Sequence, residues 1–343
     1  MILIDATYIH ESGGKSLLEY LIKSLIKAGK AFNLLLDNRI ETDILRYINS
    51  KQYVYIISSE SARADYYKKN KERIDRVFCF ANVPPPRINS QTKVFILFHN
   101  SLILADLFEK NGYSIKEKLF FLLRRFYIRY KSKKRYKWIV QTKSMKSKLH
   151  HTLSITNKSI YILPFFDLSK SDNSLIRDSE LPQFLYVADG VKQKNHGLLL
   201  NAWEILNETH KLRVPLHLTI PDRFPKLIYR IQQMTERGLQ ITNHGLCDKE
   251  KVYGLYQNCS FLVFPSLAES FGLPLLEATA AGCKVLASNL SYVYDVISPT
   301  DTFDPYSASD IAHVIAKSIH SNRKTKALVH DRINDLINLL YQD

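Results

Sequence analysis

Short apolar runs alternate with helix-like segments along almost the whole sequence. In the first half, the strand candidates are ILIDA, FNLLLD, YVYIIS, RVFCFAN and KVFILFHN. The segment KSLLEYLIKSLIKAG has the period of an amphipathic helix and ends at Gly29. Runs that are apolar almost throughout are typical of parallel strands covered on both faces. The sequence therefore predicts a doubly wound α/β sheet.

The alternation is interrupted once and then restarts. Residues 164–182 are polar and rich in turn-forming residues, with proline at both ends, which indicates a linker. Further strand-like and helix-like runs extend from QFLYVAD to CKVLAS, and the segment from Ala308 onward is expected to be helical. A chain of 343 residues is long enough for two domains. We expect them at 1–165 and 166–325, with a C-terminal helix of about 326–343 packing back on the first.

Two such units indicate where a ligand would bind. Two Rossmann-like domains would face each other across a central cleft. Ligands of open α/β sheets bind beyond the carboxyl ends of the strands. Candidate functional residues are therefore sought in the loops that follow the strand candidates.

The charge of the chain indicates the kind of partner. Lysine and arginine outnumber aspartate and glutamate by 48 to 33, and the formal net charge is +15. Such an excess favours nucleic acid, an acidic membrane surface or phosphorylated ligands. The four cysteines form no CxxC pair, so neither a zinc site nor disulfides are expected, and a reducing compartment fits. Asp5 interrupts the apolar N-terminus and no apolar run approaches the ~20 residues that span a bilayer, so we expect a cytoplasmic protein.

One stretch concentrates candidate site residues: SLAESFGLPLLEATAAG, from Ser266 to Gly282. It overlaps the end of the strand candidate SFLVFPS, so its first residues lie at a carboxyl strand end. Pro274 suits the first turn of a helix and Gly282 suits its end, which predicts a helix over about 273–281. Glu269 would then lie in the loop before this helix.

This arrangement suits a phosphorylated sugar ligand. The unpaired backbone N–H groups at a helix start and the helix dipole favour a phosphate. In the predicted helix these groups would belong to Phe271, Gly272 and Leu273. Carboxylates such as Glu269 and Glu277 accept hydrogen bonds from sugar and ribose hydroxyls. The stretch therefore indicates a nucleoside diphosphate sugar, the alternative being that both glutamates are ordinary loop and helix-surface residues.

The stretch FPSLAESFGLPLLEATAAGCKVLASN resembles the E-x7-E signature of glycosyltransferase family four, which has the GT-B fold. FLYVADGVKQKNHGLLLNAWEIL and ITNHGLCDKEKVYGLYQNCSFLVFPS are similar to other segments of that family's donor domain, so the resemblance covers about Phe184 to Asp304. The N-terminal half matches more loosely, through ESGGKS and VPPPR…VFILFHN. The resemblance implies two Rossmann-like domains, retention of the anomeric configuration, and no metal ion or other cofactor.

The resemblance also implies roles for individual residues. Glu269 would contact the donor sugar and stabilise charge at the anomeric carbon, Glu277 would bind the ribose, and Lys194 would neutralise the leaving diphosphate. The diphosphate would be held by the backbone N–H groups of Ser270, Phe271, Gly272 and Leu273. Asp189 stands where the family has an arginine, which places an acid beside the expected diphosphate; Lys192 is one candidate replacement. A member with altered or reduced activity therefore stays open.

Residues of the N-terminal half are further candidates. Gly13 and Gly14 follow the first strand and would admit a donor phosphate or the acceptor, with a plain strand-to-helix turn as the alternative. GGKS is not a nucleotide triphosphate loop, because Ile9 stands where that motif needs a glycine. His99 ends the strand candidate KVFILFH and is the third catalytic candidate, after Glu269 and Lys194. The resemblance implies that it contacts the donor sugar, and a structural histidine is the alternative.

The segment 116–138 mixes basic and apolar residues. At helical spacing its apolar side chains share one face: Leu119, Leu122, Leu123, Phe126 and Tyr130. We expect a helix that lies on an anionic membrane surface, where a lipid-linked acceptor would be found. The alternative is a core helix whose basic face is solvated. Nucleic acid is not an expected partner, since no known nucleic-acid module is present.

Together these features predict a bacterial-type retaining glycosyltransferase. It would move a hexose-type sugar from a nucleotide-diphosphate sugar to a glycan acceptor, lipid-linked, in the synthesis of O-antigen, capsule or exopolysaccharide. It would be cytoplasmic and peripheral on the inner face of the membrane. The alternatives are a membrane- or polyanion-associated GT-B protein with a decayed donor site, and another GT-B sugar-nucleotide enzyme.

Overall fold

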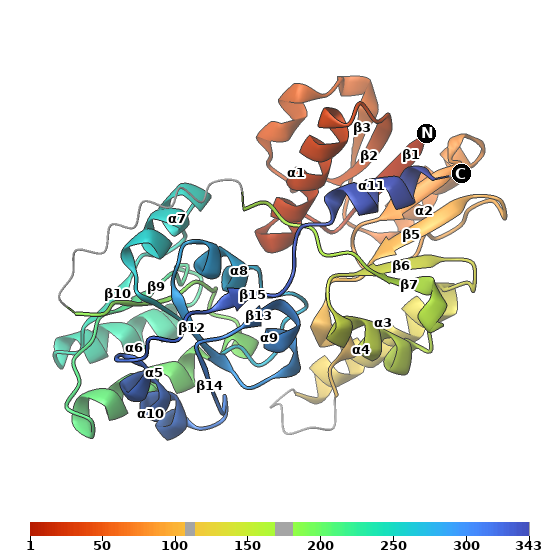
Figure 1. The fold of residues 1–343 in the computed structure, drawn as a ribbon. Helices are drawn as coiled ribbons and strands as arrows, with labels where there is room; N and C mark the ends of the chain where they lie inside the picture. The colour runs from red at the N-terminus through yellow and green to blue at the C-terminus, as the bar shows by residue number, and fades with distance from the viewer. Residues whose placement is uncertain (107–113, 169–180, 343) are drawn as a thin grey trace. The chain divides into compact units, whose positions relative to one another are not determined.

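The computed structural model describes residues 1–106, 114–168 and 181–342. Contacts divide the chain into two compact units: unit 1 contains Met1–Asp167 and His330–Asp343, and unit 2 contains Leu168–Val329. Figure 1 shows that each unit is an α/β domain. Most of the expected linker, 164–182, lies outside the described residues.

Within the described residues, unit 1 is built on a seven-stranded parallel sheet in the order β3-β2-β1-β4-β5-β6-β7. Its strands are β1 Ile2–Ala6, β2 Phe32–Asp37, β3 Tyr53–Ile56, β4 Arg76–Cys79, β5 Lys93–Leu97, β6 Lys137–Val140 and β7 Ile160–Ile162. Its helices are α1 Ser12–Lys27, α2 Glu60–Asn70, α3 Ile115–Lys131, α4 Lys143–Leu153 and α11 Ile333–Tyr341. The strand order reverses between β1 and β4, and this switch point is where open α/β sheets bind ligands.

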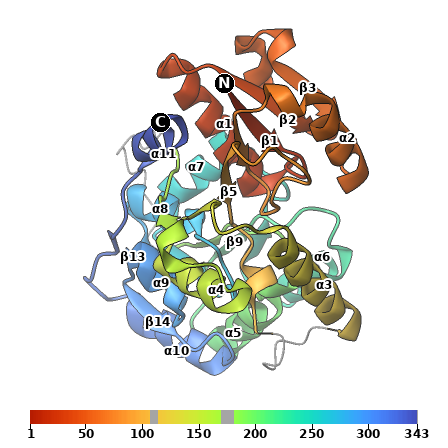
Figure 2. The same ribbon diagram turned by 90° about the vertical axis from the view of Figure 1, so that its right-hand side faces the viewer.

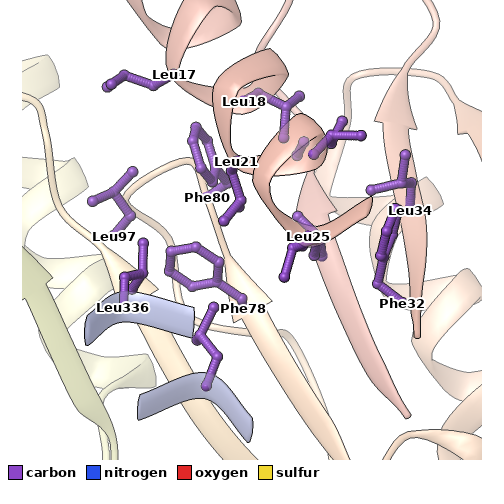
Figure 3. Packing of buried hydrophobic residues seen from close by; sticks show 14 of the residues in the cluster. Leu17, Leu18, Leu21, Leu25, Phe32, Leu34, Phe78, Phe80, Leu97 and Leu336 are labelled. Carbon is purple, nitrogen blue, oxygen red and sulfur yellow. The ribbon is translucent and has the colours of Figure 1, made fainter. Parts of the chain in front are cut away.

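The buried core of unit 1 includes apolar side chains of its central strands. On one face, α1 and α11 pack against the sheet (Figure 3). Leu18 and Leu21 are fully buried three residues apart, which places them on one face of α1. Figure 3 shows Leu336 of α11 facing Phe78 and Leu97 of the sheet. The last helix of the chain is therefore part of the first unit's core.

Unit 2 has a parallel sheet in the order β10-β9-β8-β11-β12-β14 over the described residues. The strands are β8 Phe184–Tyr186, β9 Leu216–Leu218, β10 Ile241–Asn243, β11 Phe261–Phe264, β12 Lys284–Ser288 and β14 Asp301–Phe303. The helices are α5 His196–Glu208, α6 Pro225–Glu236, α7 Lys249–Asn258, α8 Leu273–Ala280, α9 Ser291–Val296 and α10 Ala308–Ser318. Counted within the unit, the order is 3-2-1-4-5-6, as in dinucleotide-binding Rossmann domains. The switch point here lies between β8 and β11.

The prediction that the chain is helical from Ala308 onward is wrong for the middle of that segment. After α10, Lys326–Ala327 form β15, which pairs antiparallel with β13 Ile297–Ser298. The hydroxyl of Thr325 accepts a hydrogen bond from the backbone of Val285, 2.8 Å away. Hydrogen bonds to other parts of unit 2 thus hold this stretch extended. The final helix is correspondingly shorter than the expected 326–343.

Candidate functional site

The candidate donor site lies at the switch point of unit 2, where β8 and β11 are neighbouring strands. The loop after β8 carries Asp189 and Lys194, and the loop after β11 carries Glu269. The N–H of Leu267 donates a 2.8 Å hydrogen bond to the carbonyl of Gln193, which joins the two loops. Residues 75 positions apart in the sequence are thereby brought to one place.

Lys194 and Glu269 form an ion pair at the centre of this site. The Nζ atom of Lys194 lies 2.5 Å from Oε1 of Glu269, and the side chains are only 20% and 13% exposed. The hydroxyl of Ser266 donates to the same oxygen at 2.7 Å. Charge-assisted hydrogen bonds of this kind are stronger than neutral ones. The structure therefore holds a cation and an acid side by side.

A frame of hydrogen bonds fixes the backbone around Lys194. The hydroxyl of Tyr186 donates to the Lys194 carbonyl at 2.8 Å. Asn195 has φ 60°, and its side chain donates to the carbonyl of Pro305 at 2.7 Å. The next residue, His196, lies against the Tyr186 ring, with 4.8 Å between ring centroids. Burial is the main cause that lowers the pKa of His196 to about 3, so its ring is neutral.

The sequence prediction missed these supporting residues. Only Asn195 carries a signal that could have been used, because asparagine tolerates positive φ better than other side chains. Tyr186 sits in the strand β8, and Ser266 in the loop after β11. Nothing local distinguishes either from a structural residue. Their roles depend on which strands are neighbours.

The start of α8 has the geometry that the sequence predicted. Gly272 is its N-cap, with φ 81°, and a Cβ there would lie 3.0 Å from Leu275. The positive φ therefore favours glycine here, and a Cβ would also require the side chain of Leu275 to shift. The helix spans Leu273–Ala280, close to the predicted 273–281, and Pro274 lies in its first turn. The first N–H groups of a helix have no helical acceptor, so they point outward from the α8 start.

Glu277 lies one turn further along α8. Its Oε2 accepts a hydrogen bond of 3.1 Å from the hydroxyl of Tyr256, a buried residue of α7. Burial raises the pKa of Glu277, while Tyr256 and Lys249 oppose this shift. Neither Glu277 nor Glu269 is thus an ordinary solvated surface glutamate, which was the alternative interpretation of the stretch. Whether Glu277 contacts a ribose stays a prediction.

Asp189 is paired with an arginine from a neighbouring loop. Its Oδ2 lies 3.3 Å from Nη2 of Arg223, which precedes α6. Gly190 permits this approach, because a Cβ there would lie 2.4 Å from the ring of Phe224. Lys192, the replacement suggested by the sequence, has an exposed side chain. The acid at the family's arginine position therefore comes with a compensating cation that sequence reasoning did not find.

Gly13 and Gly14 lie inside the first turn of α1, which begins at Ser12, instead of preceding the helix as expected. Gly13 is exposed, and a Cβ there would meet nothing within 4 Å. A Cβ on Gly14 would lie 3.6 Å from Cε1 of His99 and 3.3 Å from the side chain of Ile9. The structure therefore brings Gly14 and His99 together at the carboxyl ends of β1 and β5.

A backbone hydrogen bond fixes the position of His99, and one nitrogen of its ring has no hydrogen-bond partner among the described residues. Its N–H donates to Oδ1 of Asn82 at 2.7 Å. Burial lowers the pKa of His99 to about 4, against the smaller opposing effect of the Phe80 backbone. Its Nε2 atom is buried without a hydrogen-bond partner among the described residues. A buried polar atom of this kind is suited to a ligand hydroxyl.

The surface of α3 combines apolar and basic side chains. Ser114 and Glu117 form a capping box at its N-terminus, and α3 lies beside α4 (Figure 2). Ile128 is fully buried, whereas Leu123, Phe126 and Tyr130 are 61%, 71% and 73% exposed. The apolar face predicted from the sequence therefore points mainly to solvent. This result disfavours the alternative of a core helix.

Across 1–106, 114–168 and 181–342, no group of three or more histidine, cysteine, aspartate or glutamate side chains has the arrangement of a metal site. Within the same residues, no helix has both the length and the hydropathy needed to cross a bilayer.

Comparison with protein families matches residues 169–332 to the family described as "Glycosyl transferases group 1". A curated relative is "Serotype-specific mannosyltransferase WbdA" of Escherichia coli, which is 34% identical over 132 residues. The match covers 37% of this chain and 16% of WbdA, so the chain spans about a sixth of that relative's length.

Solved structures match over the whole chain. A structure of WaaG, described as a glycosyltransferase involved in lipopolysaccharide biosynthesis, has a TM-score of 0.69 at 14% identity and covers 100% of both chains. The structure of Anabaena Alr3699/HepE in complex with UDP-glucose has a TM-score of 0.65 at 14% identity, covering 99% of this chain and 95% of that one. At such identities the similarity shows the fold, which is GT-B as the sequence predicted.

Proposed function

We propose, because residues 169–332 match the glycosyl transferases group 1 family, that the chain is a glycosyltransferase acting from a nucleotide-diphosphate hexose. The observation that carries this proposal is the Lys194–Glu269 ion pair at the switch point of unit 2. The similarity to WbdA, named a mannosyltransferase, supports a hexose, and the UDP-glucose complex of HepE supports a nucleotide donor.

The two charges of the pair would have different roles in sugar transfer. The ammonium of Lys194 would neutralise charge that develops on the leaving diphosphate, and backbone N–H groups of residues 270–273 at the α8 start would add donors. The carboxylate of Glu269 would accept hydrogen bonds from the sugar and face the positive charge at the anomeric carbon. Glu277 would bind the ribose and His99 the sugar. The new bond would keep the anomeric configuration, without a metal ion.

The acceptor in this proposal is a lipid-linked glycan of bacterial surface polysaccharide. Support comes from α3, whose exposed Leu123 and Phe126 are accompanied by exposed basic residues of the same helix, such as Lys116 and Arg129. An amphipathic helix of this composition binds anionic membrane surfaces. The protein would then act as a peripheral protein on the cytoplasmic face of the membrane.

A second candidate function is favoured by one observation. Asp189 places a negative charge in the loop that leads to Lys194, next to the expected diphosphate. A protein that kept the fold and its membrane contact but lost donor binding would tolerate such a residue. The Arg223 partner argues against this, because it offsets the charge of Asp189.

Calorimetry with the intact protein tests the proposal. UDP, GDP, UDP-hexoses and GDP-mannose are titrated with and without a chelator. We expect one nucleotide class to bind. At about 100 times its dissociation constant, such a ligand raises the free energy of unfolding by roughly 2.7 kcal/mol. The anomeric configuration of the product, read by NMR, is expected to match that of the donor. Binding of no nucleotide would favour the decayed-site alternative, and an inverted product would refute the proposed stereochemistry.

A further inference from the structure

Glu60 joins two elements of unit 1 that are far apart in the sequence. It is the first residue of α2 and follows the N-cap Ser59. Its Oε1 accepts a 2.7 Å hydrogen bond from the hydroxyl of Tyr8, in the loop after β1. Its Oε2 accepts a 2.7 Å hydrogen bond from the hydroxyl of Tyr127, on α3. Both carboxylate oxygens are therefore occupied, each by a different element.

Arg63 extends this connection to the loop after β4. Its Nη1 lies 3.2 Å from Oε1 of Glu60 and 3.0 Å from the carbonyl of Pro84, and its Nη2 donates to the carbonyl of Val83 at 3.1 Å. Its Nε is paired with Asp5 of β1 at 2.7 Å, and both side chains are buried. Glu60 and Arg63 thus tie together the loops after β1 and β4. These loops flank the switch point of unit 1.

The loop after β1 needs such a support. Tyr8 has φ 81°, a conformation that costs free energy for a residue with a side chain. Its N–H donates to Oδ2 of Asp37 at 3.1 Å, and the N–H of Ile9 donates to the carbonyl of Ala6 at 3.0 Å. Ile9 packs beside Gly14, which in turn lies next to His99. The conformation of Tyr8 therefore bears on the candidate residues of unit 1.

We propose that Glu60 is a positioning residue that links α3 to the switch-point loop of unit 1 through Tyr127 and Tyr8. A force or contact that moves α3 is transmitted to the loop through the carboxylate of Glu60. The biological role of this link rests on the proposed function, in which contact with a membrane would move α3. The link itself rests only on the hydrogen bonds of unit 1.

Hydrogen exchange of the intact protein without membranes tests the link. The amides of residues 7–9 are all hydrogen-bonded, so their exchange rates report opening of the loop. Tyr127→Phe removes one oxygen that bonds none of these amides, and we expect the amides to exchange about tenfold faster. Glu60→Gln, which can accept but also donates, is expected to have an equal or larger effect. Amides in α4 should not change, which separates positioning from general destabilisation.

Tyr130→Phe is the matched control, because it makes the same change on the same helix at an exposed position. It should leave residues 7–9 unchanged. Unchanged exchange in both Tyr127→Phe and Glu60→Gln would overturn the proposal. So would an equal change in the Tyr130 control.

A second arm adds vesicles of phosphatidylglycerol and phosphatidylcholine. In the wild-type protein, binding is expected to change the exchange of residues 7–9 by severalfold. The Tyr127→Phe variant should still bind the vesicles but lose this response; a response that persists would contradict transmission through Glu60. If the wild-type protein does not sediment with the vesicles, the membrane proposal fails, while the first arm still decides the link.

Discussion

The ammonium of Lys194 and the carboxylate of Glu269 lie 2.5 Å apart, although they come from loops that follow two different strands, β8 and β11. Each charge positions the other, and the hydroxyl of Ser266 donates a hydrogen bond to the same carboxylate oxygen. The group that we assign to the leaving phosphate and the group that we assign to the sugar therefore hold each other in place. Because the two charges interact, a variant that lacks both differs in a predictable way from the variants that lack one.

Glu269→Gln and Lys194→Met are each expected to lower kcat for sugar transfer roughly 100- to 1,000-fold, since each removes a charge that acts in the transition state. Each single variant should also lose about 1 to 3 kcal/mol of stability, because it leaves a largely buried charge without its partner. The double variant should recover part of the stability but none of the activity. Steady-state kinetics and thermal unfolding measure the two effects.

Glu204→Gln is the control for that experiment, since Glu204 also forms ion pairs, with Arg230 and Arg237, but on the outer helices of unit 2. It should retain full activity. Activity near the wild-type level in either single site variant would rule out the roles assigned to the pair.

The Asp189–Arg223 pair should control affinity for diphosphate more than stability. Both side chains are partly exposed, so breaking the pair should cost at most about 1 kcal/mol of stability. Arg223→Gln leaves the acid uncompensated and is expected to weaken binding of the nucleoside diphosphate, whereas Asp189→Asn should strengthen it. Affinity for the matching monophosphate should change much less. Calorimetry with both nucleotides makes the comparison, with Arg237→Gln as the control.

Equal effects on diphosphate and monophosphate would show that Asp189 and Arg223 lie away from the second phosphate of the diphosphate. The same conclusion would follow if Arg237→Gln, whose partner is Glu204, had the effect of Arg223→Gln.

His99 should make the stability of unit 1 depend on pH. Burial lowers its pKa to about 4, below the value of about 6.5 in an unfolded chain. Between these values the unfolded state binds more protons, so the free energy of unfolding falls as pH decreases from about 6.5 toward 4. The stabilisation is fully present above about pH 6.5. His99→Gln should remove about 1 to 3 kcal/mol of this pH dependence in denaturant titrations near pH 7 and pH 5.

His151→Gln provides the comparison, because His151 is an exposed histidine of unit 1. It should leave the slope unchanged. A His99→Gln variant with the wild-type slope would mean that folding does not lower the pKa of His99.

The exposed face of α3 should bind anionic vesicles. Replacing Leu123 and Phe126 with serine removes two exposed apolar side chains, and we expect roughly a tenfold or greater loss of vesicle affinity. Binding of the wild-type protein should fall as salt is added, because the basic residues of α3 are screened. Sedimentation with anionic and with neutral vesicles measures both effects.

Tyr229→Ser is the matched control, since Tyr229 is 61% exposed on α6 of unit 2. It should bind as the wild-type protein does. Recovery of the wild-type protein in the supernatant with both vesicle types would refute the membrane contact.

Local patterns were sufficient to predict most elements of both sheets. The segment HGLLLNAWEILNE forms α5 His196–Glu208, and the glycine and proline signals placed α8 within a residue of its observed end. Such signals work because helix period, N-terminal proline and positive-φ glycine act within a few neighbouring residues. The extended stretch around Lys326 was missed because its conformation depends on β13, not on its own residue preferences.

For the candidate site too, some residues could be predicted from the sequence and some contacts could not. The strand-end pattern was enough to single out Glu269 and, on the helix that follows, Glu277, whereas Lys194 was singled out by the resemblance to a family motif. That Arg223 meets Asp189, and that Glu60 receives both Tyr8 and Tyr127, was decided only by the folded structure. These contacts join residues 34, 52 and 67 positions apart. No local preference encodes them, because they exist only once the order of the strands has brought distant loops together.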